Sequence, residues 1–185
     1  MQTTLFRSVG TPYQGYRFFF VLVCLFSKVH WVVLAKSQAA WSDIWPNFVR
    51  REQARSGTKF CVGQLITDNH TVHSQTSMKL FNNQNGIEPV TSAPYNQWGD
   101  PAESGVKVVS WMMRANMVQG GGKPHMWGWC GKATAQQINA TMPPNPVEGH
   151  EGICRLQILH PTESTDKIMR RMHTFLQLAM APRVP

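Results

Sequence analysis

The chain has 185 residues and a formal net charge of +8, from 18 Lys and Arg residues against 10 Asp and Glu residues. Hydrophobic residues make up 42% of the sequence, which excludes global disorder and allows one packed domain with a terminal appendage. The basic residues are scattered, and Arg50-Arg51 and Arg170-Arg171 are the only basic doublets. Nucleic-acid-binding proteins usually gather positive charge on one face or in one run, so this pattern disfavours nucleic acid as the main partner.

The stretch from Tyr16 to Trp41 is almost wholly apolar and is interrupted by Lys28 and His30. Read as a secretory signal, it has a basic start, an apolar run over residues 18–26 and small residues for cleavage at Ala35 or Ala39. Read as a membrane anchor, residues 18–34 are nearly long enough to span a bilayer, although Lys28 would cost about 2.5–3.5 kcal/mol. We therefore predict that residues 1–35 are a signal peptide or a membrane anchor.

Two other interpretations of this stretch remain open. No acidic residue precedes Asp43, which is typical of a mitochondrial leader, and the strong apolar block would then indicate an inner-membrane protein. Alternatively, the stretch is a buried helix or a pair of strands in a soluble domain. The sequence favours a secreted or membrane-anchored protein, with the mitochondrial inner membrane as the alternative location.

The predicted elements then follow in chain order. A helix is expected over residues 42–55, because Trp41, Ile44, Trp45 and Phe48 recur at helical spacing. Residues 58–67 read as a strand, and residues 70–81 as a second and more polar strand. Residues 82–89 form a turn-rich link with Asn85-Gly86 as a hairpin-type signal.

The second half of the chain is expected to alternate between loops and short elements. Residues 91–105 are predicted to be a loop, residues 106–113 a strand, residues 132–140 a short helix and residues 152–159 a strand. Apolar residues from Ile168 to Ala179 share one helical face, which predicts a terminal helix that Pro182 ends. The predicted fold class is α+β: a small antiparallel or mixed sheet, with one amphipathic helix before it and another at the C-terminus. Residues 41–185 would form a single domain.

Cys61, Cys130 and Cys154 lie in the predicted domain, and no CxxC spacing is present. In an oxidising compartment they allow one disulfide, for which we favour Cys61 with Cys154 because both lie in strand-like runs. The alternative is that they are buried thiols that pack as small apolar side chains. Two sequons, at Asn69 and Asn139, are candidate glycosylation sites.

Cys130 follows a Gly- and Trp-rich turn at the expected start of a helix. A helix N-terminus lowers the pKa of a thiol, so Cys130 is a candidate nucleophile with His150 or His160 as its base. His70 and His73 would point to opposite faces of a strand, so no metal site is predicted, and no cofactor.

The predicted function is a non-catalytic binding domain, secreted or membrane-tethered. It would contact a protein or an anionic surface through exposed side chains at Trp127, Trp129, Arg50 and Arg51, with a membrane contact possible through residues 18–34. Three alternatives stay open: a cysteine hydrolase, an accessory subunit of a mitochondrial membrane complex, and an orphan reading frame without a defined activity.

Overall fold

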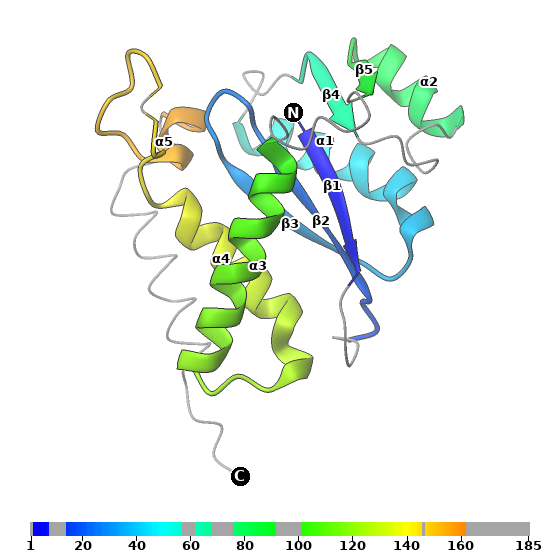
Figure 1. Ribbon diagram of the computed structural model, residues 1–185. Coiled ribbons are helices and arrows are strands. Elements are labelled where there is room, and N and C mark those ends of the chain that lie inside the picture. Colours follow the sequence, from blue (N-terminus) through cyan, green and yellow to red (C-terminus); the bar gives the residue numbers. More distant parts are fainter. Residues whose placement is uncertain are drawn as a thin grey trace.

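The computed structural model describes residues 2–7, 14–56, 62–67, 76–91, 101–145 and 147–161. Its centre is a five-stranded sheet in the order β3-β2-β1-β4-β5 (Figure 1). The strands are β1 (Gln2–Arg7), β2 (Phe18–Val23), β3 (His30–Ala35), β4 (Gln64–Thr67) and β5 (Glu88–Thr91). Strands β1, β2 and β3 pair antiparallel, whereas β4 pairs parallel with both β1 and β5.

The apolar stretch near the N-terminus forms the hairpin of β2 and β3, with Phe18 opposite Ala35 and Val23 opposite His30. A tight turn joins the two strands: the Cys24 N–H donates to the Val29 carbonyl, and Lys28 has a positive φ of 57°. Residues Phe19 to Val23 are all buried, because both faces of the sheet are covered. A strand that is covered on both faces reads as a continuous apolar run and not as an alternating one.

Helices α1 (Trp41–Ser56) and α2 (Thr76–Gln84) cover one face of the sheet, and the short helix η1 (Gln38–Ala40) leads into α1. Trp41 and Trp45 are fully buried there and stack on each other, with ring centroids 5.7 Å apart. Trp45 Nε1 also donates to Asn82 Oδ1 at 2.9 Å, which ties α1 to α2. This confirms the predicted helix over residues 42–55 and its apolar stripe.

Helices α3 (Pro101–Gln119) and α4 (Trp127–Asn139) cover the other face, joined through η4 (Pro124–Met126), and α5 (Arg155–Leu159) follows (Figure 1). Alternate residues of β2 divide between the two cores: Phe20 and Leu22 face α1, whereas Phe19 and Val21 face α3 and α4. The architecture is a sheet between two helical layers.

Three predicted strands are wrong. Residues 106–113 lie within α3, residues 76–81 of the predicted 70–81 strand lie within α2, and residues 155–159 form α5. In α3 the buried residues Val106, Val109 and Ser110 fall at i, i+3 and i+4, which is the helical period. Their β-branched neighbours favoured a strand, and packing on the sheet overrides that propensity.

The predicted membrane contact through residues 18–34 is not supported, because these residues form β2, which lies inside the sheet, and most of β3, which lies at its edge. The signal peptide or membrane anchor over residues 1–35 stays a prediction. Among the residues that the structure describes, no helix is long and apolar enough to cross a membrane. Cleavage at Ala35 or Ala39 stays a prediction, but it would remove β1, β2 and β3 from the sheet.

The mixed α+β class with a small sheet and several helices is confirmed. The order differs from the predicted one, because three strands precede the first long helix and helices cover both faces. The predicted terminal helix between residues 168 and 179 lies outside the described residues.

Candidate nucleic-acid interface

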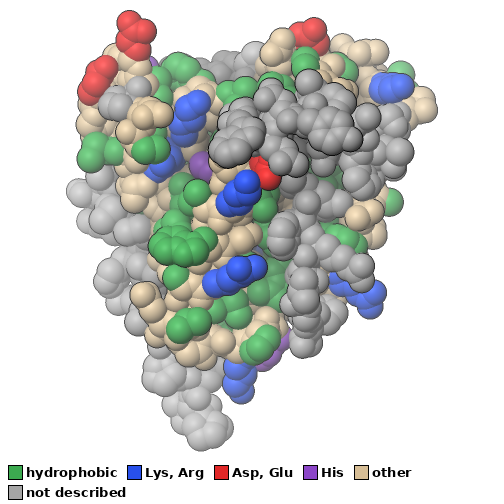
Figure 2. Space-filling model, viewed as in Figure 1, with side chains coloured by type: hydrophobic (Ala, Val, Ile, Leu, Met, Phe, Trp, Pro, Cys, Tyr) green, Lys and Arg blue, Asp and Glu red, His purple; other side chains and the backbone are tan. Residues whose placement is uncertain are grey.

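The outer face of α3 combines basic and aromatic side chains. Lys107, Trp111 and Arg114 follow one another at i, i+4 and i+7, so they lie on one stripe of the helix. All three are exposed, and Trp111 is 71% exposed. Val108 and Val118 flank them and are 45% and 82% exposed. Figure 2 shows basic and hydrophobic side chains side by side along this face. We call Lys107, Trp111 and Arg114 the α3 stripe.

The opposite side of α3 fixes the stripe to the sheet. Val106 and Val109 are buried against the core that β2 and β3 share with α4. Gly105 permits the close approach: a Cβ there would lie 2.8 Å from Val23 Cγ2 and 3.2 Å from two atoms of the His30 ring. The N-terminal part of α3 therefore rests directly on the end of β2 and the start of β3.

Replacing Gly105 with Ala is expected to destabilise the fold by about 1–2 kcal/mol. Overpacking costs about 1–3 kcal/mol, and the higher helix propensity of Ala offsets up to about 1 kcal/mol of that. Chemical unfolding followed by circular dichroism measures the difference. The control is Ser104→Ala, at the exposed neighbouring position, which should leave stability unchanged; equal effects at both positions would contradict the close approach at Gly105.

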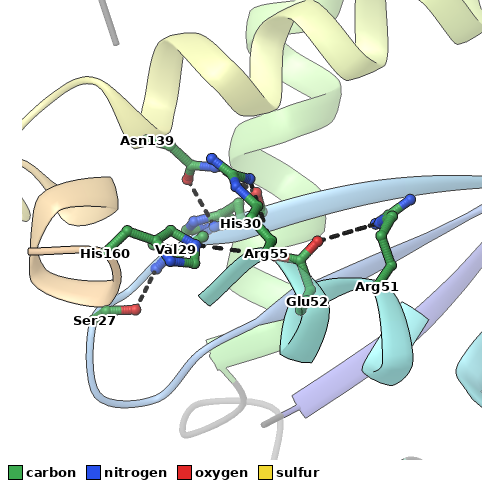
Figure 3. A network of polar contacts seen from close by, with 8 residues as sticks. All are labelled: Ser27, Val29, His30, Arg51, Glu52, Arg55, Asn139 and His160. Atoms are coloured by element: carbon green, nitrogen blue, oxygen red, sulfur yellow. Dashed lines mark hydrogen bonds and ion pairs between the residues drawn. The ribbon is translucent and has the colours of Figure 1, made fainter. Parts of the chain in front are cut away.

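His30 is the point where β3, α3 and α4 meet. The Asn139 side chain bridges its backbone: Oδ1 accepts from the His30 N–H at 2.7 Å, and Nδ2 donates to the His30 carbonyl at 2.7 Å (Figure 3). Arg155 donates to the Ile138 carbonyl at 2.7 Å and to Thr141, which fixes the end of α4. The pKa of His30 is lowered to about 4, mainly by burial and in part by the positive charge of Arg155, against a hydrogen bond with the Lys28 carbonyl.

A buried carboxylate at Glu52 joins α1 to the segment after α5 (Figure 3). Glu52 is 2% exposed and lies 3.3 Å from Arg51 Nη2 and 4.0 Å from Arg55 Nη1. His160 Nε2 lies 4.0 Å from the same carboxylate and is also buried. This cluster holds distant parts of the chain together and lies on the α1 side of the sheet.

Glu103 is the only acidic side chain in the sequence of α3. Glu103 lies in the first turn of α3, and its Oε1 is 3.0 Å from Lys107 Nζ. Strands β1, β2 and β3 contain no Asp or Glu. Within the described part of the chain, no three His, Cys, Asp or Glu side chains gather as a metal site would require. Asp68 directly follows β4 in the sequence and lies outside that part.

The structure does not bring the predicted hydrolase residues together. Cys130 is the fourth residue of α4, and burial raises the pKa of its thiol, although a hydrogen bond with Thr134 opposes this. Its Sγ contacts the Met113 carbonyl at 3.4 Å. The His150 ring packs against Phe26 with centroids 5.7 Å apart, and His160 contacts Glu52. The pKa of Cys130 therefore moves in the direction opposite to the one that a thiolate nucleophile needs.

The predicted binding residues lie in three different places. Trp127 is 6% exposed and packs against Phe19, so it belongs to the core. Trp129 is partly buried and lines a cavity between α3 and α4. Arg50 and Arg51 are exposed on α1 and lie over the rings of Phe81 and Phe48. No surface unites these four side chains.

The candidate modification sites are only partly described. Asn139 is 7% exposed, and both ends of its side-chain amide are bound to His30, so it has a structural role. Cys154 is buried and forms no disulfide with a described cysteine. Asn69 and Cys61 lie outside the described residues, so the pairing of Cys61 with Cys154 stays a prediction.

Sequence reasoning missed the α3 stripe. The prediction of a strand over residues 106–113 gave Lys107 and Trp111 the spacing of a strand and left Arg114 outside the element. A helical reading from Pro101, which the structure places at the start of α3, would have aligned the three side chains.

No family model matches the chain, and no curated protein sequence does either. Solved structures with the same fold do exist. One is the simian T-cell lymphotropic virus intasome in complex with the PP2A regulatory subunit B56 gamma, with a TM-score of 0.62 and 16% identity. That match covers 100% of this chain and 55% of the other, so this chain spans about half its length.

A second is the HTLV-2 integrase catalytic core domain in complex with magnesium, with a TM-score of 0.61 and 17% identity. This match covers 86% of the chain and 94% of the core domain. At these identities the similarity establishes the fold. The chain therefore has the fold of a retroviral integrase catalytic core.

This fold corrects the predicted function and partners. The predicted non-catalytic secreted or membrane-tethered binding domain is contradicted, because the structures that share the fold are integrase cores. The alternatives named above and the predicted location stay predictions. The same finding contradicts the prediction that nucleic acid is a disfavoured partner. The positive charge looked scattered in the sequence because the stripe residues are three and four positions apart, and the helix brings them onto one face.

Proposed function

We propose that this chain is a nucleic-acid-binding domain built on the integrase-core fold, and that the α3 stripe is its binding surface. The observation that carries the proposal is the exposed Trp111 with a basic side chain one helical turn away on either side. The net charge of +8 supports an anionic partner.

The chemistry of the stripe suits a nucleic acid backbone and its bases. Lys107 and Arg114 supply donors for phosphate oxygens, and such contacts dominate affinity and make it depend on salt. The indole of Trp111 offers a flat face on which an unpaired base can stack. Because base stacking is tolerant of sequence, we expect binding with little sequence preference.

Glu103 modulates this surface through its ion pair with Lys107. The pair is exposed on both sides, with the side chains of Lys107 and Glu103 71% and 36% exposed, so it is weak enough for a phosphate to replace the carboxylate. We expect Lys107 to exchange Glu103 for phosphate when nucleic acid binds.

Magnesium is named for the HTLV-2 core, and among the residues described here no group of three His, Cys, Asp or Glu side chains could hold a metal ion. Protein-bound Mg²⁺ is usually held by one or two carboxylates together with substrate phosphates. Glu103 is the only acidic side chain among β1, β2, β3 and the described part of α3, and it is paired with Lys107. The proposal therefore assigns binding and includes no metal-dependent step.

The test is fluorescence anisotropy with labelled DNA at several salt concentrations. Trp111→Ala is expected to weaken binding by about 1–3 kcal/mol, whereas Trp111→Phe should retain most of the affinity. Lys107→Gln and Arg114→Gln should each lower the slope of log affinity against log salt by about one.

Lys79→Gln serves as the matched control, because Lys79 is exposed on α2 and lies on the other side of the sheet. It should change neither the affinity nor the salt slope. Stripe variants that bind like the unmodified chain would overturn the proposal, and so would a control variant that loses as much affinity as they do.

A further inference from the structure

A cavity of about 170 Å³ lies between α3 and α4, apart from the α3 stripe. Its walls come from the end of α3, the connector around Gly120–Gly122 and one side of α4. An apolar cavity of about 150 Å³ is large enough to hold a benzene molecule, so this cavity has room for one aromatic ring. The space is therefore of the right size for a small ligand.

The apolar walls favour an aromatic ligand. Met117 and Met126 contribute two flexible thioethers, and Trp129 contributes an indole. Thioether sulfur makes favourable contacts with ring edges, and Met side chains adapt to the shape of what they contact. Ala133 is the small residue on α4 that keeps the space open.

Gln119 and Cys130 contribute to the polar part of the wall, and Asn116 and Gln137 form an amide pair in it. Asn116 Nδ2 donates to Gln137 Oε1 at 2.7 Å and to Thr134 Oγ1 at 3.0 Å. This uses the Asn116 donor and the Gln137 acceptor. The Gln137 Nε2 donor and the Asn116 Oδ1 acceptor make no hydrogen bond with another described residue. The two atoms left over match the acceptor and the donor of an amide.

The residues around the cavity also favour an uncharged ligand over a charged one. None of the ten residues that line the cavity is Asp, Glu, Lys, Arg or His. A charged ligand would lose its hydration without gaining an opposite charge, which is costly in an apolar site. We propose that the cavity between α3 and α4 is a binding site for an uncharged single-ring aromatic molecule that carries an amide-like edge. The proposal does not depend on nucleic-acid binding.

Three probes of the same shape test it: benzamide, benzoate and toluene. Binding is followed by thermal unfolding and by NMR of ¹³C-methyl Met, where Met117→Leu identifies the signal of Met117. Benzamide at ten times its Kd should raise the ratio of folded to unfolded protein about elevenfold. Benzoate should not bind, because it carries a charge, and toluene should bind more weakly than benzamide.

Two variants locate the site. Gln137→Leu should weaken benzamide about two- to tenfold and leave toluene unchanged, because only benzamide uses the donor. Ala133→Leu fills the cavity and should abolish the binding of both benzamide and toluene. Ala140→Leu, beyond the end of α4, is its matched control and should leave the binding of both unchanged. The proposal is overturned if benzamide does not bind the unmodified chain, if benzoate binds equally well, or if Gln137→Leu affects benzamide and toluene alike. If Ala133→Leu fails to fold, the other comparisons decide the outcome.

Discussion

Replacing Asn139 with Ala is expected to lower the free energy of unfolding by about 2–4 kcal/mol. The Asn139 amide pairs with both backbone groups of His30, each at 2.7 Å. Strand β3 is an edge strand, so His30 has no neighbouring strand on that side to replace the lost bonds. Each buried backbone group left without a partner costs about 1–3 kcal/mol, and partial access of water reduces the sum. Urea unfolding followed by circular dichroism measures the change.

Asn83→Ala is the matched control, because Asn83 is exposed on α2 and its replacement should change stability by no more than about 0.5 kcal/mol. Asn139→Asp adds a second comparison. Aspartate keeps an acceptor for the His30 N–H but has no donor for the His30 carbonyl when it is ionised. It should therefore recover only part of the lost stability at neutral pH. An Asn139→Ala variant as stable as the Asn83→Ala control would show that the bridge contributes nothing.

The sequence predicted the parts of the fold whose hydrophobic period matches their burial. The stripe of Trp41, Trp45 and Phe48 has the 3.6-residue period and is buried as predicted. Residues 18–23 lack any period because both faces of β2 are buried, so they resembled a signal or an anchor. Each apolar block has about six residues on its side of the turn, a length that fits a β-strand better than a transmembrane helix.

The site was harder to predict because its residues depend on tertiary packing. Val106, Val108 and Val109 favour strands locally, and the contact of Val106 and Val109 with the sheet favours the helix instead. Asn139 was read as a glycosylation site because its partner His30 is 109 positions away. His30 itself stood out only as an interruption of an apolar run. Neither role has a local pattern that sequence reasoning could detect.

The unfolding free energy is expected to fall by about 3 kcal/mol between pH 7 and pH 4 through His30 alone. Burial lowers the pKa of His30 from 6.5 to about 4 in the folded chain, so the unfolded chain binds the extra proton first. The contribution is fully present above pH 6.5 and is lost as the pH falls toward 4, at about 1.4 kcal/mol for each pH unit between the two pKa values. Protonation would place a charge beside Gly105 in the first turns of α3, where the helix dipole also disfavours a cation.

The measurement is urea unfolding at pH 7, 6, 5 and 4 on the unmodified chain and on His30→Gln. The variant should lose about 3 kcal/mol less than the unmodified chain over this range, because it cannot take up the proton, whatever its stability at pH 7. His125→Gln, at an exposed ring in η4, should keep the slope of the unmodified chain. If the unfolding free energy of His30→Gln changed with pH as steeply as that of the unmodified chain, His30 would not be held neutral in the folded chain. Gly105 of α3 packs against the same His30 ring. A steep dependence of stability on pH through His30 would therefore also make the packing of α3, which carries the α3 stripe, sensitive to acid.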